Sequence, residues 1–394
     1  MSQIHSLPFT TRVHPNLKQI TERDCKRVAH FQAGHQPHHG KKHGHKHAEP
    51  QHCGPSGSST CIPVTNAGVT YLADVGFGSP ATTCKLLIDT GSSNTWCLMP
   101  PYKTSSTSKD TRKKFSIKYG LGDCSGDLYT DRVTLGPKLV IEDQCIGAAC
   151  EADDMNGLDG ILGIGPCDLT QGTTADSTNI PTVTDNCVQQ GLITKECIGI
   201  YYEPTRSNNE MTGSLSFGGP DKTKYIGELN YVPITKTKPA CLYWGIEQSI
   251  TYDGQEIMAR GAGIADTGTT LVMLPKKTFE AYCCATGATL DQTTGLLTVT
   301  QEQYGRMKSM MFNIGGVQYA LTKNAQIWPR SQNEQLGVPS DKICLIFASM
   351  GDMENPGLCF INGFTFLQRF YSVYDTTNNQ VGFATTEHTM TETN

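Results

Sequence analysis

An Asp-Thr-Gly triplet at the end of an apolar segment occurs twice in this sequence, about half a chain apart. The first copy is LLIDTGSSNTW at residues 86–96, and the second is GIADTGTTLV at residues 263–272. In each copy the glycine permits a tight turn and a close approach of the backbone. Self-similarity at this distance indicates two related lobes, each of which places one carboxylate on a turn. The plainer alternative is two unrelated surface Asx-turns.

The two aspartates, Asp89 and Asp266, suit acid–base chemistry if the lobes bring them together. Two adjacent carboxyl groups cannot both ionise easily, so the pair shares one proton and titrates as a unit. Such a pair can act as general acid and general base on one water molecule. We expect hydroxyls and glycines of the two turns to hold the acids without a counter-cation: Thr90, Gly91 and Ser92 in the first turn, and Thr267, Gly268 and Thr269 in the second.

Basic residues and histidines are concentrated in the first part of the chain. Ten of the eleven His lie in residues 1–52, and only His388 lies beyond, which nearly excludes a Ser-His or Cys-His nucleophile in the body. The same 52 residues hold eight Lys or Arg against three Asp or Glu, although the whole chain has a net charge of −5. We interpret residues 1–61 as a basic pro-segment and linker with little to bury, which covers an acidic cleft. The alternatives are a plain disordered tail and a metal-binding His tract at residues 35–52.

Cysteine usage and targeting signals bear on the compartment. Sixteen Cys suggest an oxidising environment, and the absence of a C-x-x-C motif argues against a zinc ribbon. Residues 1–20 contain no apolar signal segment, and no segment reaches membrane-spanning length. We expect an extracellular protein, with a vacuolar or intracellular location left open. Disulfide candidates, from sequence separation alone, are Cys53 with Cys61, Cys84 with Cys97, Cys145 with Cys150, Cys187 with Cys197, and Cys344 with Cys359.

From residue 69 onward, short apolar segments separated by Gly and Pro predict a mostly β chain. We divide it into an N-terminal β lobe at residues 62–235 and a C-terminal β lobe at residues 236–394. Residues 115–129 predict a hairpin with a Gly-rich tip, which suits a lid, although an ordinary cross-strand aromatic is the plainer interpretation of Tyr119. Residues 279–287 predict a short helix that ends at a glycine.

The segment from residue 69 to 385 resembles the pepsin-like aspartic proteases, and among them the polyporopepsin type of basidiomycete fungi. The resemblance implies two β-rich lobes around a long cleft, with Asp89 and Asp266 as the catalytic pair. This pair would activate a water to attack the scissile carbonyl and would protonate the leaving amine. Besides both triplets, the segments that carry the resemblance include residues 75–83, 159–166, 180–186, 243–246, 325–330 and 370–384.

The resemblance also assigns residues around the cleft. Tyr119, followed by Gly120, is similar to the flap tyrosine whose hydroxyl reaches the indole of Trp96, and Leu87 and Ile161 match apolar positions that shape the pocket on the acyl side. The resemblance therefore implies a monomeric endopeptidase that cleaves proteins or peptides at acid pH beside hydrophobic residues. It further implies a zymogen whose partner is its own pro-segment, with no cofactor, no metal, and neither nucleic acid nor membrane as partner.

The sequence departs from the family pattern in the flap and in the leader. Leu121, Asp123 and Cys124 stand where relatives carry small Ser-like residues, and for the carboxylate and the thiol we expect an altered subsite preference or a flap tethered by a disulfide. The inhibitory lysine that is usual in the family's leaders has no assignable counterpart here. Two other functions were weighed: a non-catalytic pepsin-like binding or inhibitor protein, against which both intact triplets argue, and a metal-responsive protein that uses the His tract.

Overall fold

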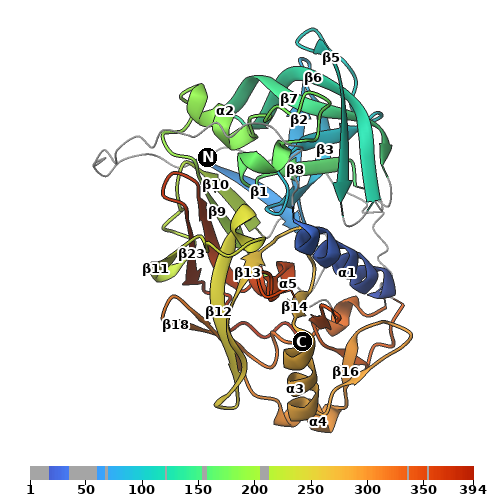
Figure 1. Cartoon of the computed structure of the whole chain (residues 1–394), viewed down its shortest axis with the longest axis vertical. Helices are drawn as coiled ribbons and strands as arrows, with labels where there is room; N and C mark the ends of the chain where they lie inside the picture. The colour runs from blue at the N-terminus through green and yellow to red at the C-terminus, as the bar shows by residue number, and fades with distance from the viewer. Residues whose placement is uncertain are drawn as a thin grey trace, which may run out of the picture.

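The computed structural model of the chain describes residues 17–34, 60–66, 70–119, 122–152, 158–204, 213–334, 337–352 and 355–394. The expected mostly β architecture of two β-rich lobes is confirmed (Figure 1). The His tract at residues 35–52, Cys53 and Gly120 lie outside the described residues. None of the described helices is long and apolar enough to cross a membrane.

Within the described residues, the largest sheet has thirteen strands in the order β11-β23-β22-β9-β10-β1-β2-β3-β8-β4-β7-β6-β5. It runs from the upper lobe of Figure 1 down into the middle of the molecule. Its strands are β1 (Thr60–Asn66), β2 (Tyr71–Phe77), β3 (Thr82–Asp89), β4 (Thr95–Leu98), β5 (Lys109–Tyr119), β6 (Gly122–Gly136), β7 (Leu139–Ala152), β8 (Gly160–Gly163), β9 (Cys197–Tyr202), β10 (Gly213–Phe217), β11 (Ile226–Pro233), β22 (Phe370–Asp375) and β23 (Gln380–Thr385).

The second lobe is built on two smaller sheets, which in the described residues have the orders β18-β17-β12-β13-β21-β14-β20 and β15-β16-β19. Their strands are β12 (Gly245–Tyr252), β13 (Gln255–Ala265), β14 (Val272–Leu274), β15 (Thr289–Leu290), β16 (Leu297–Val299), β17 (Met310–Ile314), β18 (Val317–Leu321), β19 (Ile343–Cys344), β20 (Phe347–Ser349) and β21 (Phe360–Asn362).

Helices are few and short outside the leader. The expected helix near residue 280 is confirmed as α3 (Lys276–Thr286), and Gly287 ends it in the left-handed conformation with φ of 72°. The expected hairpin is confirmed as β5 and β6, whose antiparallel pairing extends from Lys109 opposite Thr130 to Tyr119 opposite Gly122. The other helical segments are α1 (Leu17–Ala33), α2 (Val183–Gln189), α4 (Gln301–Arg306), α5 (Phe364–Leu367) and three 3₁₀ turns at Cys167–Thr170, Ala240–Leu242 and Arg330–Gln332.

The two lobes repeat one strand arrangement around each triplet. β3 ends at Asp89 and pairs in parallel with β8, and β13 ends one residue before Asp266 and pairs in parallel with β21. The strand that follows each triplet, β4 or β14, then pairs antiparallel with that same partner. Each aspartate therefore lies on a turn between two strands that share a neighbour.

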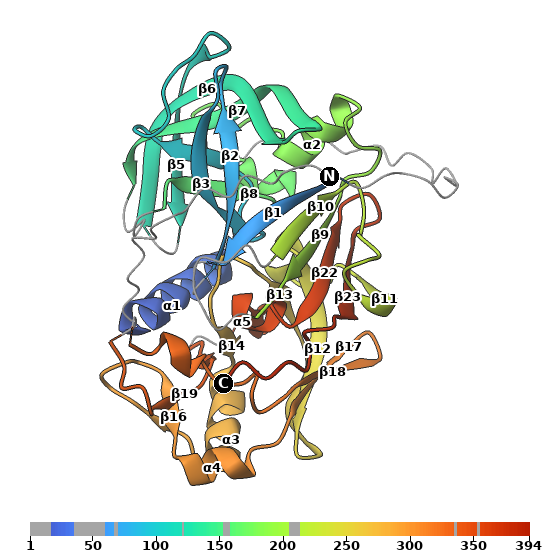
Figure 2. The same ribbon diagram turned by 180° about the vertical axis from the view of Figure 1, so that it is seen from behind.

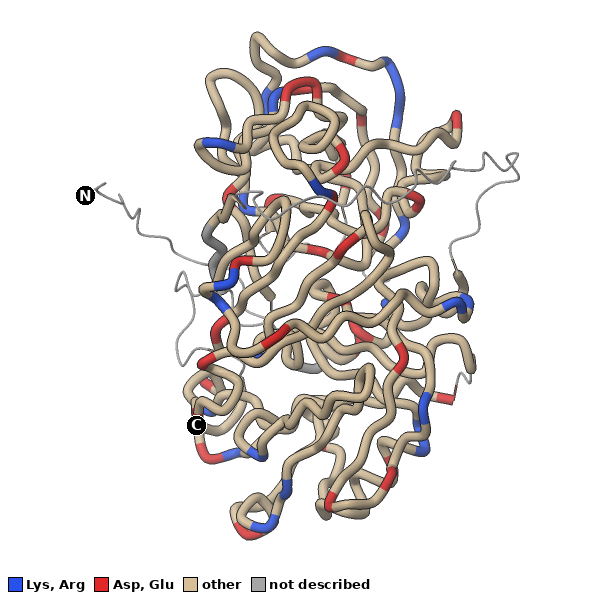
Figure 3. The backbone as a smooth tube through the Cα atoms, turned by 90° about the vertical axis from the view of Figure 1, so that its left-hand side faces the viewer, with Lys and Arg blue, Asp and Glu red and all other residues tan. Residues whose placement is uncertain are grey.

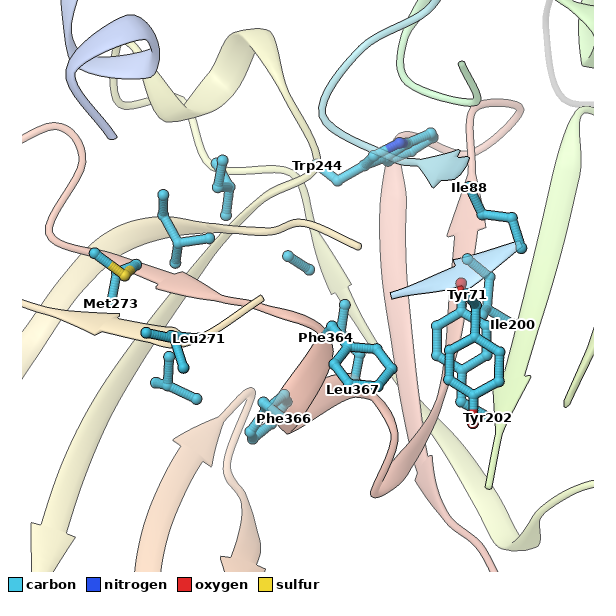
Figure 4. Close-up of a cluster of buried hydrophobic side chains, with 14 of the residues drawn as sticks. Tyr71, Ile88, Ile200, Tyr202, Trp244, Leu271, Met273, Phe364, Phe366 and Leu367 are labelled. Carbon is cyan, nitrogen blue, oxygen red and sulfur yellow. The ribbon is translucent and has the colours of Figure 1, made fainter. Parts of the chain in front are cut away.

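A continuous hydrophobic core lies beneath the two turns. Figure 4 shows Tyr71 and Tyr202 stacked beside Ile88, with Phe364 and Leu271 toward the second lobe. The rings of Tyr71 and Tyr202 are 3.7 Å apart at their centroids and nearly parallel, at 2°. All five side chains are buried, so the strands that end in the triplets rest on close-packed support.

The strands nearest the C-terminus belong to the same sheet as the first lobe. Ser372 of β22 is opposite Ile200 of β9, and Gly382 of β23 is opposite Tyr231 of β11. Figure 2 shows β22 and β23 beside β9 and β11 in the middle of the molecule. This central part of the sheet connects the two lobes.

The leader contains a helix, α1, and buries more than the sequence led us to expect. Ile20, Val28 and Phe31 are each at most 1% exposed. Their spacing of eight and three residues places them on one face of an α-helix. Figures 1 and 2 show α1 at the junction between the two lobes. The expectation that this segment has little to bury is therefore wrong for residues 20–33.

Candidate active site

The turn of the first triplet holds Asp89 by its own atoms. The backbone N–H of Gly91 donates to Oδ1 of Asp89 at 2.9 Å, and the hydroxyl of Ser92 donates to Oδ2 at 2.5 Å. Asp89 is fully buried. Hydrogen bonds of this kind stabilise the ionised form of a carboxyl group and fix its orientation.

The second triplet repeats this geometry around Asp266. The backbone N–H of Gly268 donates to Oδ1 at 3.1 Å, and the hydroxyl of Thr269 donates to Oδ2 at 2.5 Å. Asp266 is also fully buried. The two carboxylates thus have the same kind of partners, which the duplicated strand arrangement places in equivalent positions.

The threonines of the triplets join the two turns. The backbone N–H of Thr90 donates to Oγ1 of Thr267, and that of Thr267 donates to Oγ1 of Thr90, both at 3.0 Å. Each hydroxyl donates in turn to a carbonyl of the opposite lobe, Thr90 to Ala265 at 3.1 Å and Thr267 to Ile88 at 2.7 Å. Four buried hydrogen bonds therefore fix one aspartate relative to the other.

The two glycines leave room for the opposite acid. A Cβ atom added at Gly91 would lie 2.5 Å from Oδ1 of Asp266, and one added at Gly268 would overlap Oδ1 of Asp89. Real Cβ atoms do not approach other atoms so closely. A side chain at either position would push the facing carboxylate away, so the short distance between the two lobes at this point requires both glycines.

The guanidinium of Arg27, from α1, lies between the two carboxylates. Its Nη2 is 2.5 Å from Oδ1 of Asp89 and 3.0 Å from Oδ1 of Asp266, and its Nε is 2.7 Å from Oδ2 of Asp266. The Arg27 side chain is 3% exposed and both carboxylates are 0% exposed. Our expectation that the acids lack a counter-cation is therefore wrong, because Arg27 of α1 supplies one.

This buried ion pair differs in kind from those on the surface. Figure 3 shows basic and acidic residues interspersed along both lobes, and pairs such as Lys109 with Asp143 are mostly exposed. Exposed pairs contribute little because water and salt screen them. A buried pair that loses one partner leaves an uncompensated charge, which is strongly destabilising. The buried interaction of Arg27 with Asp89 and Asp266 therefore depends on the charges of the guanidinium and the carboxylates.

The two acids are electrostatically unequal while Arg27 is present. Burial, together with the nearby charge of Asp266, raises the pKa of Asp89 although Arg27 opposes the rise. Burial also acts to raise the pKa of Asp266, but the charge and hydrogen bonds of Arg27 outweigh it and lower that pKa. Burial acts to lower the pKa of Arg27, and both carboxylates outweigh it and raise that pKa. While Arg27 is present, the two carboxyl groups therefore differ in the direction of their pKa shifts, upward at Asp89 and downward at Asp266.

Two further residues of α1 hold Arg27 in place. The carboxylate of Asp24 accepts the backbone N–H of Leu271 at 2.7 Å and that of Thr270 at 3.2 Å. One turn beyond Arg27, the ring of Phe31 lies beneath the guanidinium, with 4.9 Å from its carbon to the ring centroid. Residues spaced three and four apart share one helix face, so these contacts arise from a single face of α1.

The flap residues form a second buried cluster beside the acids. Nε1 of Trp96 donates to the hydroxyl of Tyr119 at 2.7 Å, and the indole is fully buried. Leu87 and Ile161 pack in the same cluster, at 4% and 3% exposure. The structure thus brings these four side chains together.

The unusual flap residues take different positions. Cys124 is 2% exposed and packs in the cluster with Trp96. The cysteines of the described residues are free thiols in the structure, so it contains neither the expected tether of the flap nor any of the expected disulfides between described cysteines. Asp123, its neighbour in β6, is exposed. No group of three or more His, Cys, Asp or Glu in the described residues could hold a metal ion.

The comparison with protein families decides the membership of the chain. Residues 70–386 match the model of the eukaryotic aspartyl protease family. The chain belongs to this family. It is therefore an aspartic endopeptidase, and this membership argues against the alternative of a non-catalytic binding or inhibitor protein.

Individual aspartyl proteases show how far the likeness extends. The chain is 50% identical to polyporopepsin of Irpex lacteus over 337 residues, which cover 84% of this chain and 99% of that one. It is 32% identical to cathepsin E of Rattus norvegicus, over 80% and 79% of the two chains. The crystal structure of an aspartic proteinase from Irpex lacteus superposes with a TM-score of 0.83 at 49% identity and covers 86% of this chain and all of that one.

α1 lies outside the matched region, and sequence reasoning missed the site residues of this helix. Asp24, Arg27 and Phe31 were not identified, because no lysine could be assigned to the usual inhibitory position of aspartyl protease leaders. A signal was present in the spacing of these residues. Together with Ile20 and Val28 they occupy positions i, i+4, i+7, i+8 and i+11, which describes an apolar helix face interrupted by one acid and one base.

Proposed function

We propose that Asp89 and Asp266 are the catalytic residues of this aspartic endopeptidase and hydrolyse peptide bonds at acid pH. The observation that carries the proposal is that one guanidinium bonds to both carboxylates. A water molecule shared by the two acids needs the same position, within hydrogen-bond reach of each. With α1 displaced, that position is open to water.

The proposed reaction uses the pair as base and acid in turn. One carboxylate removes a proton from the water as its oxygen attacks the scissile carbonyl carbon, while the protonated partner gives its proton to the carbonyl oxygen. The resulting diol then collapses: the protonated carboxyl group gives its proton to the amide nitrogen, the other carboxylate removes a proton from one diol hydroxyl, the C–N bond breaks, and a carboxylic acid and an amine leave. One shared proton is required, so activity falls when both acids ionise.

We propose a preference for hydrophobic side chains beside the cleaved bond. A cavity of about 410 Å³ remains between α1 and the flap, and its lining is mixed: Ile117, Tyr119 and Leu169 supply apolar surface beside polar residues such as Ser92, Asn94 and Thr173. The apolar part of this lining favours apolar side chains. Proteins and peptides with such residues are therefore the proposed substrates.

We further propose that residues 17–33 make the chain a zymogen. Arg27 occupies the water position, Asp24 anchors the helix on the second lobe, and Phe31 fills part of the cleft. The pKa of Asp266 is lowered by Arg27, so this interaction stabilises the bound helix above the ordinary pKa of the acid and is lost as the pH falls. Acid therefore releases the leader.

The proposed setting is extracellular, with the enzyme acting as a monomer on protein substrates. Sixteen cysteines favour an oxidising compartment. The acid requirement fits an enzyme that is held inactive at neutral pH and is released where the medium is acidic.

The deciding experiment measures cleavage of denatured haemoglobin from pH 3 to 7 after acid incubation of the full chain, with and without pepstatin. We expect inhibitor-sensitive cleavage at acid pH, accompanied by loss of the leader. Asp89→Asn and Asp266→Asn should each abolish it, whereas Asp74→Asn, which changes an exposed acid paired with Lys85, should leave it intact. Tight pepstatin binding without cleavage in the wild type would overturn the proposal in favour of a binding protein.

A further inference from the structure

Two buried cysteines lie on the strands that flank the candidate catalytic turn. Cys84 is on β3, which ends at Asp89, and Cys97 is on β4, which follows the turn. Both side chains are 0% exposed. In this structure both are free thiols, and their Sγ atoms are 2.7 Å apart. Non-bonded heavy atoms of this size normally stay about 3.5–4 Å apart, and a disulfide bond is about 2.05 Å long, so the two sulfurs are already much closer than two unconnected groups.

The strand arrangement explains how residues on non-adjacent strands come together. β8 separates β3 from β4, but it begins at Gly160, which is opposite Leu86 on one side and Cys97 on the other. Cys84 lies two residues before Leu86, beyond the start of β8. The two sulfurs therefore approach each other just beyond the first residue of β8, where no strand lies between β3 and β4. Gly160 has no side chain, and a Cβ there would overlap the backbone of Trp96, so β4 can approach closely.

We propose that Cys84 and Cys97 form a disulfide that cross-links the two strands carrying the first catalytic turn. Residues 85–96 lie between them and include Asp89, Thr90, Gly91 and Ser92. The cross-link closes a short loop, which restricts the unfolded chain and leaves the folded turn unchanged. Its role is structural, and it is independent of the proposed peptide hydrolysis.

The bond requires an oxidant, and a small-molecule disulfide such as oxidised glutathione supplies it. The thiolate of one cysteine attacks the disulfide, forms a mixed disulfide and releases one thiol. The second cysteine then attacks the mixed disulfide at the protein sulfur and releases the other thiol. Two protein thiols and one small disulfide thus become one protein disulfide and two small thiols.

Because both sulfurs are buried in the folded lobe, the disulfide has to form during folding. Neither sulfur is accessible to an oxidant in the folded lobe, and the neighbouring Cys84 sulfur and burial raise the pKa of Cys97, which disfavours the reactive thiolate. The exchange therefore takes place while the chain is still open, and the finished bond is protected from reductants until the lobe unfolds.

Peptide mapping of the full chain tests the proposal directly. The protein is refolded with reduced and oxidised glutathione, then denatured in an alkylating reagent without reductant and digested. We expect a cross-linked peptide that contains both residues and is lighter than the two thiol peptides by two hydrogens. Recovery of both cysteines in alkylated form would overturn the proposal.

Thermal unfolding of variants gives a second measurement. We expect Cys84→Ala and Cys97→Ala each to lower the melting temperature by roughly 5 °C, because each removes the cross-link. The melting temperature of the double variant should be no lower than that of the less stable single variant. Cys187→Ala, at an equally buried cysteine in α2, serves as the control, and its effect should add to either of the others. Additive losses for Cys84 and Cys97 would contradict the cross-link.

Discussion

The ring of Phe31 meets the ring of Tyr243 edge-on, with centroids 4.7 Å apart and planes inclined by 68°. The ring of Phe31 makes a second, electrostatic contact, because it also lies under the guanidinium of Arg27. Phe31 therefore connects the cation that blocks the acids to a buried aromatic on the second lobe. The leader is held in the cleft by packing as well as by charge.

Replacement of Phe31 by alanine should weaken the leader without changing the acids. Phe→Ala changes at buried sites cost about 3–5 kcal/mol, and the cation–π contact is lost as well. We expect Phe31→Ala to become active at a higher pH than the wild type when the full chain is acidified stepwise and assayed with a peptide substrate. Phe31→Leu, which keeps an apolar side chain, should lie between the two, and an unchanged activation pH in Phe31→Ala would contradict the packing role.

Arg27→Ala should remove the charge that opposes the acids and give a chain with activity before acid incubation. Arg27→Lys should keep partial inhibition, because an ammonium is a point charge that cannot reproduce the fork of the guanidinium. Lys26→Ala removes the same charge from an exposed position of α1 and is the matched control. Initial rates of the freshly diluted full chain at pH 5 provide the measurement. Equal rates for Arg27→Ala and Lys26→Ala would contradict the assignment.

Asp24 should oppose the release of the leader by acid. Burial raises the pKa of Asp24 to about 7 in the bound helix, against 3.8 for an ordinary aspartate. A group whose bound pKa is raised adds stability that is complete below the ordinary pKa and is lost as the pH rises toward 7. Acidification therefore strengthens this contact while it weakens the contact between Arg27 and Asp266.

Asp24→Asn should consequently make leader release depend more steeply on pH. The variant lacks the proton uptake that offsets the loss of the Arg27 interaction. The slope of activation against pH, measured between pH 7 and 4, reports this directly. Glu22→Gln, at an exposed acid of the same helix, should leave the slope unchanged. A slope in Asp24→Asn equal to that of the wild type would show that Asp24 does not take up a proton on docking.

Thr267→Val should loosen the junction between the two triplets. It removes the acceptor for the N–H of Thr90 and the donor for the carbonyl of Ile88, and each unsatisfied buried group costs about 1–3 kcal/mol. We expect a melting temperature lower by several degrees and a reduced kcat. Thr267→Ser keeps the hydroxyl and should restore both. If valine and serine variants behave alike, the hydrogen bonds have no such role.

Much of the fold could be predicted from the sequence because the triplets, the strand spacing and the helix ending at Gly287 are local patterns. The contact between Trp96 and Tyr119 was available only through the family resemblance, since nothing in the spacing of these two residues specifies it. The structure has both side chains in hydrogen-bond contact.

The leader could not be predicted in the same way. Its composition is rich in histidine and basic residues, and Arg27 is one of eight Lys or Arg in the first 52 residues. The residue acquires its role only from a helix that turns Asp24, Arg27 and Phe31 to one side and from a cleft whose width is set by the opposite lobe. The short distance between Cys84 and Cys97 also depends on tertiary structure, because it arises where β8 begins.

The position of β22 between β9 and β23 sets an order of events during synthesis. β22 follows β9 in the sequence only after the strands of the second lobe, and the first lobe's sheet has an open edge at β9 until β22 pairs there. Exposed strand edges favour pairing with other chains. The first lobe therefore completes its sheet only with a strand that lies beyond the second lobe in the sequence.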